Sequence, residues 1–154
     1  MIRPDALLIG IGNSGRQDDG LGWAFLDALK ETGQFPGQIN YCYQLQVEDA
    51  DLISQASQVI FIDAFKGKLK NGFQWHVCRA SGDFAFTTHA LSPEAILFLC
   101  QDLYQKDPPT YVLQIEGENW ELKTGLTPKA RENLKVALNF FVEQLSAMPA
   151  EVRQ

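Results

Sequence analysis

Ala6-Leu-Leu-Ile-Gly-Ile-Gly-Asn13 is the segment from which the architecture follows. It is a continuous apolar run that ends in glycine and then turns polar, which is typical of a strand buried on both faces. A polar loop follows up to Asp19, and residues 20–32 then show apolar residues at helical spacing until Gly33 ends the pattern. A buried strand, a loop and an amphipathic helix begin a strand–helix–strand unit, so the sequence predicts an α/β fold.

Strands and helices continue to alternate along the rest of the chain. This order favours right-handed crossovers and a mainly parallel sheet that is covered on both sides. We therefore expect a single α/β domain over residues 1–148, with a twisted, mostly parallel sheet of about five strands between helices, and a C-terminal tail over residues 149–154. The later strands are expected at 38–45, 58–63, 72–79 and 111–115, and the later helices at 48–55, after Ser92-Pro93 and after Thr127-Pro128.

The composition excludes several classes of protein. The chain of 154 residues is 45% hydrophobic and 21% charged, as in a globular protein, and its formal charge of −6 is opposite in sign to that of most duplex-binding proteins. No apolar run is long enough to cross a bilayer or to act as a secretory signal. Cys42, Cys78 and Cys100 form no C-x-x-C pair, which indicates reduced thiols. We expect a cytoplasmic protein without nucleic-acid or membrane partners, and the sequence leaves its oligomeric state open.

Polar side chains follow several of the predicted strands. Ligands of open α/β sheets bind beyond the carboxyl ends of the strands, at the point where the strand order reverses. Asp18 and Asp19 lie in the loop after the first strand, Asp63 ends the strand at 58–63, and His89 lies in the segment before the helix that Ser92 caps. Two carboxylates and an imidazole from Asp19, Asp63 and His89 suit Zn²⁺ or Ni²⁺ and leave a position for water or a substrate group.

Each of these features also has a structural interpretation. Gly10-x-Gly12-x-x-Gly15 fits a dinucleotide fingerprint, although two following carboxylates would repel a pyrophosphate. Asp18 is the better candidate for capping a helix or bracing the loop, which leaves Asp19 available. Asp63 emerges from a buried strand and needs a partner or a cation. His89 is as often structural as a ligand, and His76 is expected to be a packing or surface residue.

Four segments, in this order, resemble the hydrogenase maturation endopeptidases. Leu8-Ile-Gly-Ile-Gly-Asn13 followed by Asp18-Asp-Gly-x-Gly22 is similar to that family's signature G-[IV]-G-N-x4-D-[DE]-G-x-G. The other three segments are Val59-Ile-Phe-Ile-Asp63-Ala64, Thr88-His-Ala-Leu-Ser92 and Gly125-Leu-Thr-Pro128.

This resemblance implies a function. Asp19, Asp63 and His89 would take the family's metal-ligand places and recognise nickel that is already installed in the large-subunit precursor of a nickel–iron hydrogenase; another divalent cation such as zinc is an alternative occupant of the same site. The enzyme would then remove a short C-terminal extension. The family often has glutamate at the position of Asp19, and residues 44–49 replace its glycine- and threonine-rich loop, so no role is assigned to those residues.

The sequence leaves open the catalytic base and two alternative functions. The base that activates water is unassigned among Asp18, Asp19 and Asp63, and no serine or cysteine has an evident base partner. A non-catalytic module that checks or holds the metal-loaded precursor would use the same three ligands. Gly10-Ile-Gly-Asn-Ser-Gly15 also resembles a loop of the peptidyl-tRNA hydrolases, but the asparagine and histidine that this family has next are missing, and the acidic charge disfavours tRNA.

Overall fold

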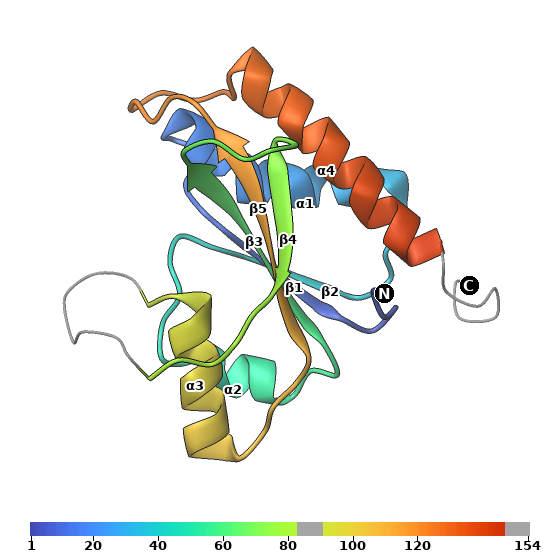
Figure 1. Ribbon diagram of the computed structural model, residues 1–154, viewed down its shortest axis with the longest axis vertical. Coiled ribbons are helices and arrows are strands. Elements are labelled where there is room, and N and C mark those ends of the chain that lie inside the picture. Colours follow the sequence, from blue (N-terminus) through green and yellow to red (C-terminus); the bar gives the residue numbers. More distant parts are fainter. Residues whose placement is uncertain (83–90, 147–154) are drawn as a thin grey trace.

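The structure, a computed structural model, describes residues 1–82 and 91–146 (Figure 1). Strands and helices alternate as the apolar pattern predicts. The strands are β1 (Leu7–Ile11), β2 (Gln38–Cys42), β3 (Val59–Lys66), β4 (Phe73–Val77) and β5 (Thr110–Gly117). The helices are α1 (Leu21–Thr32), α2 (Asp49–Ser54), α3 (Pro93–Tyr104) and α4 (Pro128–Ser146), with a short 3₁₀ turn, η1, at Gln17–Gly20.

The five strands form one sheet in the order β2-β1-β3-β5-β4. All neighbouring pairs are parallel except β4 and β5, so the expected mostly parallel sheet is confirmed. The strand order reverses between β1 and β3, because the chain places β2 on one side of β1 and then crosses to the other side for β3. The carboxyl ends of β1 and β3 therefore flank the place where a ligand is expected.

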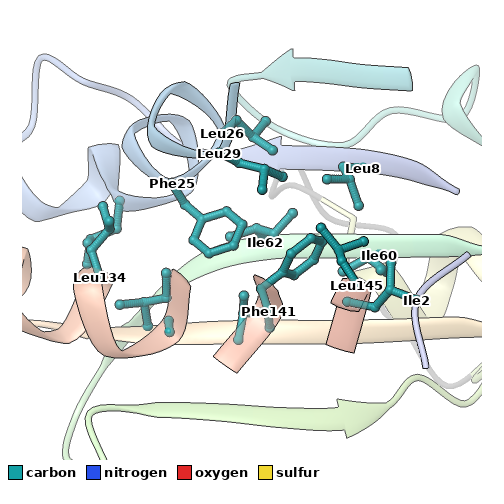
Figure 2. Packing of buried hydrophobic residues seen from close by; sticks show 14 of the residues in the cluster. Ile2, Leu8, Phe25, Leu26, Leu29, Ile60, Ile62, Leu134, Phe141 and Leu145 are labelled. Carbon is teal, nitrogen blue, oxygen red and sulfur yellow. The ribbon is translucent and has the colours of Figure 1, made fainter. Parts of the chain in front are cut away.

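Helices cover both faces of the sheet, as predicted (Figure 1). Alternate residues of the central strands point to opposite faces. On one face, Leu8, Ile60 and Ile62 pack against α1 and α4, and the rings of Phe25 and Phe141 meet there with centroids 5.4 Å apart (Figure 2). The opposite face packs against α2 and α3 and buries Leu7, Ile9, Val59, Phe61 and Val112.

The boundaries of β3 correct one expectation about Asp63. The sequence places Asp63 at the end of its strand, but β3 continues to Lys66 and Asp63 pairs with Gln114 of β5. The reason is that β3 stays paired with β5 after β1 has ended, since the last pair of β1 with β3 joins Gly10 and Ile62. Asp63 thus lies on the part of β3 that has lost its neighbour on one side.

The caps of the two long C-terminal helices confirm the sequence pattern. Ser92 Oγ accepts a hydrogen bond from the backbone N–H of Ala95 at 3.1 Å, with Pro93 in the first turn of α3. Thr127 Oγ1 accepts one from Ala130 N at 3.2 Å where α4 begins. Within residues 1–82 and 91–146, no helix combines the length and apolar character needed to cross a membrane. The predicted tail at 149–154 lies outside the described residues.

Candidate functional site

The loop after β1 folds back so that Asp19 returns to the end of that strand. Asn13 N donates to the Asp19 carbonyl at 3.0 Å, and Asp19 N donates to Arg16 O at 3.1 Å. A Cβ on Gly12 would collide with the same Asp19 carbonyl oxygen, so this close approach requires glycine. The backbone of Asp19 is therefore fixed against the β1 end of the switch point.

Helix α1 begins in direct contact with both central strands. A Cβ on Gly22 would lie 2.6 Å from Ile11 O and 2.7 Å from Ile62 O. A Cβ on Gly10 would likewise meet Leu26 of α1 at 2.6 Å. These glycines of the motif therefore serve close helix–strand packing, which is an alternative to the cradling of a pyrophosphate.

Asp18 is a bracing residue. Its carboxylate is fully buried and accepts hydrogen bonds from Glu118 N (2.7 Å), Asn119 N (3.1 Å), Thr127 N (2.8 Å) and Thr127 Oγ1 (2.8 Å). Burial by itself would raise the pKa of Asp18, but these hydrogen bonds outweigh it and the pKa lies below its ordinary value. This agrees with the loop-bracing interpretation, whereas the residue that caps α1 is Gly20.

The charge of Asp19, in η1, acts on the carboxyl group of Asp63, in β3. Burial raises the pKa of Asp63 to about 7; the hydrogen bond from Ala64 N to Asp63 Oδ1 (2.8 Å) opposes this rise, and the charge of Asp19 adds to it. Burial also raises the pKa of Asp19, while the cations of Lys66 and Arg16 lower it. The charge of Asp19 thus adds to the rise in the pKa of Asp63, so the two carboxylates are coupled electrostatically.

Two half-buried carboxylates that repel each other are stabilised by a proton or by a cation between them. Oxygen ligands from Asp19 and Asp63 leave most positions around a divalent cation open. Within the described ranges, no three histidine, cysteine or acidic side chains are placed to hold a metal ion together. His89, the third predicted ligand, lies outside the described residues. The metal-ligand roles of Asp19, Asp63 and His89 therefore stay a prediction, which the electrostatic effect of Asp19 on Asp63 fits.

A thiol near this pair was missed by the sequence analysis. Burial raises the pKa of Cys42 to about 11, and the charges of Asp49 and Asp63 add to the rise. The thiol is therefore neutral at physiological pH and a poor nucleophile. Its proximity to Asp63 follows from the register of β2 on β1, where Cys42 pairs with Ile11, and the sequence of residues 38–45 carries no signal of that register.

The cations around Asp19 were also missed, although spacing offers a signal for them. Arg16 precedes Asp19 by one turn of the loop, and Lys66 ends the strand that carries Asp63. The Lys66 ammonium lies 5.1 Å from the centre of the Trp120 ring, which packs against Gly117. Cations placed here favour the ionised form of Asp19.

Two other features lie near or on the sheet, a hollow beside β2 and a histidine in β4. An open hollow of about 580 Å³ lies at the carboxyl end of β2 and is lined by Cys42 to Gln44, Gln46, Glu48 and Asp49, which overlap the segment to which the sequence assigned no role. His76 lies half buried in β4, and its Nδ1 atom is buried without a hydrogen-bond partner among the described residues. The half-buried position is compatible with the expected role of His76 as a packing or surface residue.

No family model matches the chain, and no curated protein matches its sequence. Solved structures match its fold. The NiFe hydrogenase maturation protease HycI from Thermococcus kodakarensis aligns with a TM-score of 0.71 at 19% identity over 94% of both chains. The hydrogenase maturating endopeptidase HybD from E. coli aligns with a TM-score of 0.70 at 18% identity over 92% of both chains.

A third structure, the hydrogenase 2 maturation peptidase from a Thaumarchaeota archaeon, aligns with a TM-score of 0.68 at 17% identity over 94% of this chain and 99% of that one. At identities this low, the alignments show a shared fold alone. Because each alignment covers nearly all of both chains, the whole chain takes part in the likeness and not one substructure. This protein therefore has the fold of the NiFe hydrogenase maturation proteases.

Proposed function

We propose that this protein is an endopeptidase that removes a C-terminal extension from the nickel-loaded large-subunit precursor of a NiFe hydrogenase. The observation that supports the proposal is the raised pKa of Asp63, on β3 next to the switch point of the sheet, to which the charge of Asp19 contributes. The four sequence segments that resemble the maturation endopeptidases and the shared fold support the same activity. In this proposal His89 supplies the third ligand.

Nickel enters the site as part of the substrate. A divalent cation relieves the repulsion between Asp19 and Asp63, so a precursor that already carries its metal gains binding energy that an empty precursor lacks. Zn²⁺ is an alternative occupant of the same ligands. Recognition of the metal places the peptide chain of the precursor beside the two carboxylates, where proximity lowers the barrier to hydrolysis.

The hydrogen bonds of Asp18 reduce the number of candidates for the base that activates water. The Asp18 carboxylate already accepts four hydrogen bonds, three of them on Oδ2, and its lowered pKa makes it a weak base. Asp19 and Asp63 remain. A carboxyl with a pKa of about 7, such as that of Asp63, is suited to accept and return a proton near neutral pH.

The setting of the reaction follows from the substrate and the thiols. Within the proposal, the partner is the precursor protein and no nucleic acid or membrane is involved. The three cysteines are free, as expected in a reducing compartment, so we expect the protein to act in the cytoplasm. Cys78 and Cys100 are buried in the apolar layer under α3, which leaves them without a catalytic role.

A processing assay tests the function. Purified precursor, loaded with nickel or left without it, is incubated with the protein and its C-terminus is followed by mass spectrometry. We expect a mass loss at the C-terminus of the loaded precursor alone. A stable complex without any mass loss would replace the endopeptidase by a binding module, and neither cleavage nor complex would identify a degenerate homologue.

The site assignment has its own variants. Asp19→Asn, Asp63→Asn and His89→Ala should each abolish cleavage while the protein remains folded, as judged by circular dichroism. The matched control is Asp27→Asn on α1, because Asp27 is exposed and, among the described residues, its carboxylate accepts the Tyr41 hydroxyl. Full activity in all three site variants would reject these residues as the site.

A further inference from the structure

The 3₁₀ turn η1 and the connection between β5 and α4 form a single hydrogen-bonded unit. Asp18 joins both ends of that connection, since its carboxylate accepts from Glu118 and Asn119 at one end and from Thr127 at the other. The backbone adds further bonds, from Asp18 N to Asn119 O (3.1 Å) and from Gln17 N to Lys123 O (2.9 Å). The side chain of Gln17 accepts from Glu121 N at 3.3 Å.

This unit holds two groups of the candidate site. One is Asp19, the next residue along the chain. The other is Trp120, whose ring lies beneath the Lys66 ammonium that favours the ionised form of Asp19. The packing is close, because a Cβ on Gly117 would lie 2.7 Å from Asp18 Cβ and 2.9 Å from the Trp120 ring. A shift of Asp18 would therefore move both Asp19 and the surroundings of Lys66.

The backbone before Asp18 is held in an uncommon conformation. Gln17 has a φ of 48°, which non-glycine residues adopt rarely and only when their surroundings determine it. Thr127 extends the same network into α4, since its hydroxyl donates to Asp18 and accepts from Ala130 N. The turn that presents Asp19 thus takes its shape from bonds made by its neighbours, as no hydrogen bond to the Asp19 carboxylate is formed within residues 1–82 and 91–146.

We propose that Asp18 is a positioning residue, which fixes Asp19 opposite Asp63 by binding the β5–α4 connection through its buried carboxylate. The effect on the reaction rests on the proposed function, whereas the effect on the geometry does not. A displacement of a catalytic or binding group by about 1 Å can cost a factor of roughly 100 in rate. Asp18 would influence the reaction in this way without touching the substrate.

Amide hydrogen exchange tests the geometry directly. In Asp18→Asn, one oxygen acceptor becomes an amide donor that faces backbone N–H groups. We expect exchange at Glu118, Asn119 and Thr127 to become at least about ten-fold faster, and exchange at Asn13, whose N–H bonds to the Asp19 carbonyl, to follow. Protection in β3 should persist. An unchanged rate at Asn13 beside faster exchange at the other three amides would overturn the proposal, because Asp18 would then hold the connection alone.

Kinetics on a matched pair of threonines provide a second test, and it applies even if Asp18→Asn does not fold. Thr127→Val removes the hydroxyl that donates to Asp18, and Thr127→Ser keeps it. Thr110→Val is the control, since Thr110 is also buried and its hydroxyl donates to Pro108 O (2.8 Å) at the opposite end of β5.

We expect kcat for precursor cleavage to fall by about ten-fold in Thr127→Val with KM unchanged, and to be restored in Thr127→Ser, while Thr110→Val retains the wild-type value. An equal loss in Thr127→Val and Thr110→Val would contradict a positioning role and indicate general destabilisation. If the wild-type protein cleaves no precursor, the proposed function fails, and the exchange rate at Asn13 still decides whether Asp18 positions Asp19.

Discussion

Asp18 and Asp19 are the same residue type and adjacent in the chain, yet they occupy opposite environments. Asp18 is fully buried among four donors and its pKa is lowered, whereas Asp19 lies half buried beside Asp63 with its pKa raised. A carboxylate that accepts four hydrogen bonds is held in the fold, whereas one without such donors remains available for a cation or a proton. The number of donors around a carboxylate therefore separates structure from function at this rim.

The largest effect is expected on activity, when a carboxylate of the candidate site is replaced. Under the proposed function, Asp63→Asn should reduce the rate of precursor processing by a factor of about 10² or more, because it would remove both a ligand charge for the cation and a base of suitable pKa. Mass spectrometry of the precursor over time measures this rate. Asp27→Asn serves as the control and should process at the wild-type rate.

Stability should show the opposite ranking of the two neighbours. Asp18→Asn should lower the free energy of unfolding by about 3 kcal/mol, because it leaves the buried N–H and hydroxyl donors of Thr127 and the part-buried N–H donors of Glu118 and Asn119 poorly paired. Asp19→Asn should change it by less than about 1 kcal/mol. Urea titrations of both variants at one pH measure the two differences. Equal losses in Asp18→Asn and Asp19→Asn would show that the four hydrogen bonds do not set the two residues apart.

Asp63 and Asp18 should contribute to the pH dependence of stability with opposite signs. The raised pKa of Asp63 means that the folded protein binds this proton more tightly than the unfolded chain, so stability falls as the pH rises from about 4 to about 7. Partial exposure reduces the size of this loss to about 2 kcal/mol. Because the pKa of Asp18 is lowered on folding, this carboxylate stabilises the folded protein at every pH above the ordinary pKa of an aspartate. That stabilisation is lost as the pH falls from the ordinary pKa through the lowered pKa of the folded state.

Urea unfolding of chelator-treated protein between pH 4 and pH 8 tests these signs. Asp63→Asn should flatten the decline between pH 4 and pH 7 and raise stability above pH 7. That variant would then be more stable than the wild-type protein and less active. A decline that is identical in the wild type and in Asp63→Asn would assign the loss to another group.

The smallest effect is expected for the cation that faces Asp19. Lys66→Gln should raise the pKa of Asp19, because an attractive charge is removed while burial still disfavours the ionised form. The free energy of unfolding should change by less than about 0.5 kcal/mol, since Lys66 is exposed. Carboxyl chemical shifts measure the pKa, and Lys70→Gln, an exposed lysine in the connection between β3 and β4, is the control.

Hydrophobic periodicity was sufficient to predict the layers of the fold. Buried runs such as Val59 to Ile62 alternate their residues between two apolar layers, and Ser92-Pro93 begins α3 as predicted. The predicted end of β3 was wrong because the length of a strand depends on the strand that pairs with it. Pairing with β5 continues β3 to Lys66, and that pairing is not encoded in the residues of β3 alone.

The candidate site was predictable to the extent that it depends on strand ends. Parallel strands bring their carboxyl ends to one edge, which is why the sequence places Asp19 and Asp63 in one site, and the effect of the Asp19 charge on the pKa of Asp63 fits that prediction. The roles of Trp120 and Thr127 were not predictable, because they depend on how the β5–α4 connection folds over Asp18. Contacts of this kind join residues about a hundred positions apart and leave no local pattern.

The central claim, that Asp19 and Asp63 form one electrostatic site, is tested most directly by titrating the carboxyl carbons of both residues by NMR in the metal-free protein. The account predicts that Asp63 titrates near pH 7 and that its pKa decreases in Asp19→Asn, where the neighbouring charge is gone. An Asp63 that titrates at the ordinary acidic value of an aspartate, or at the same pH in the wild type and in Asp19→Asn, would contradict it.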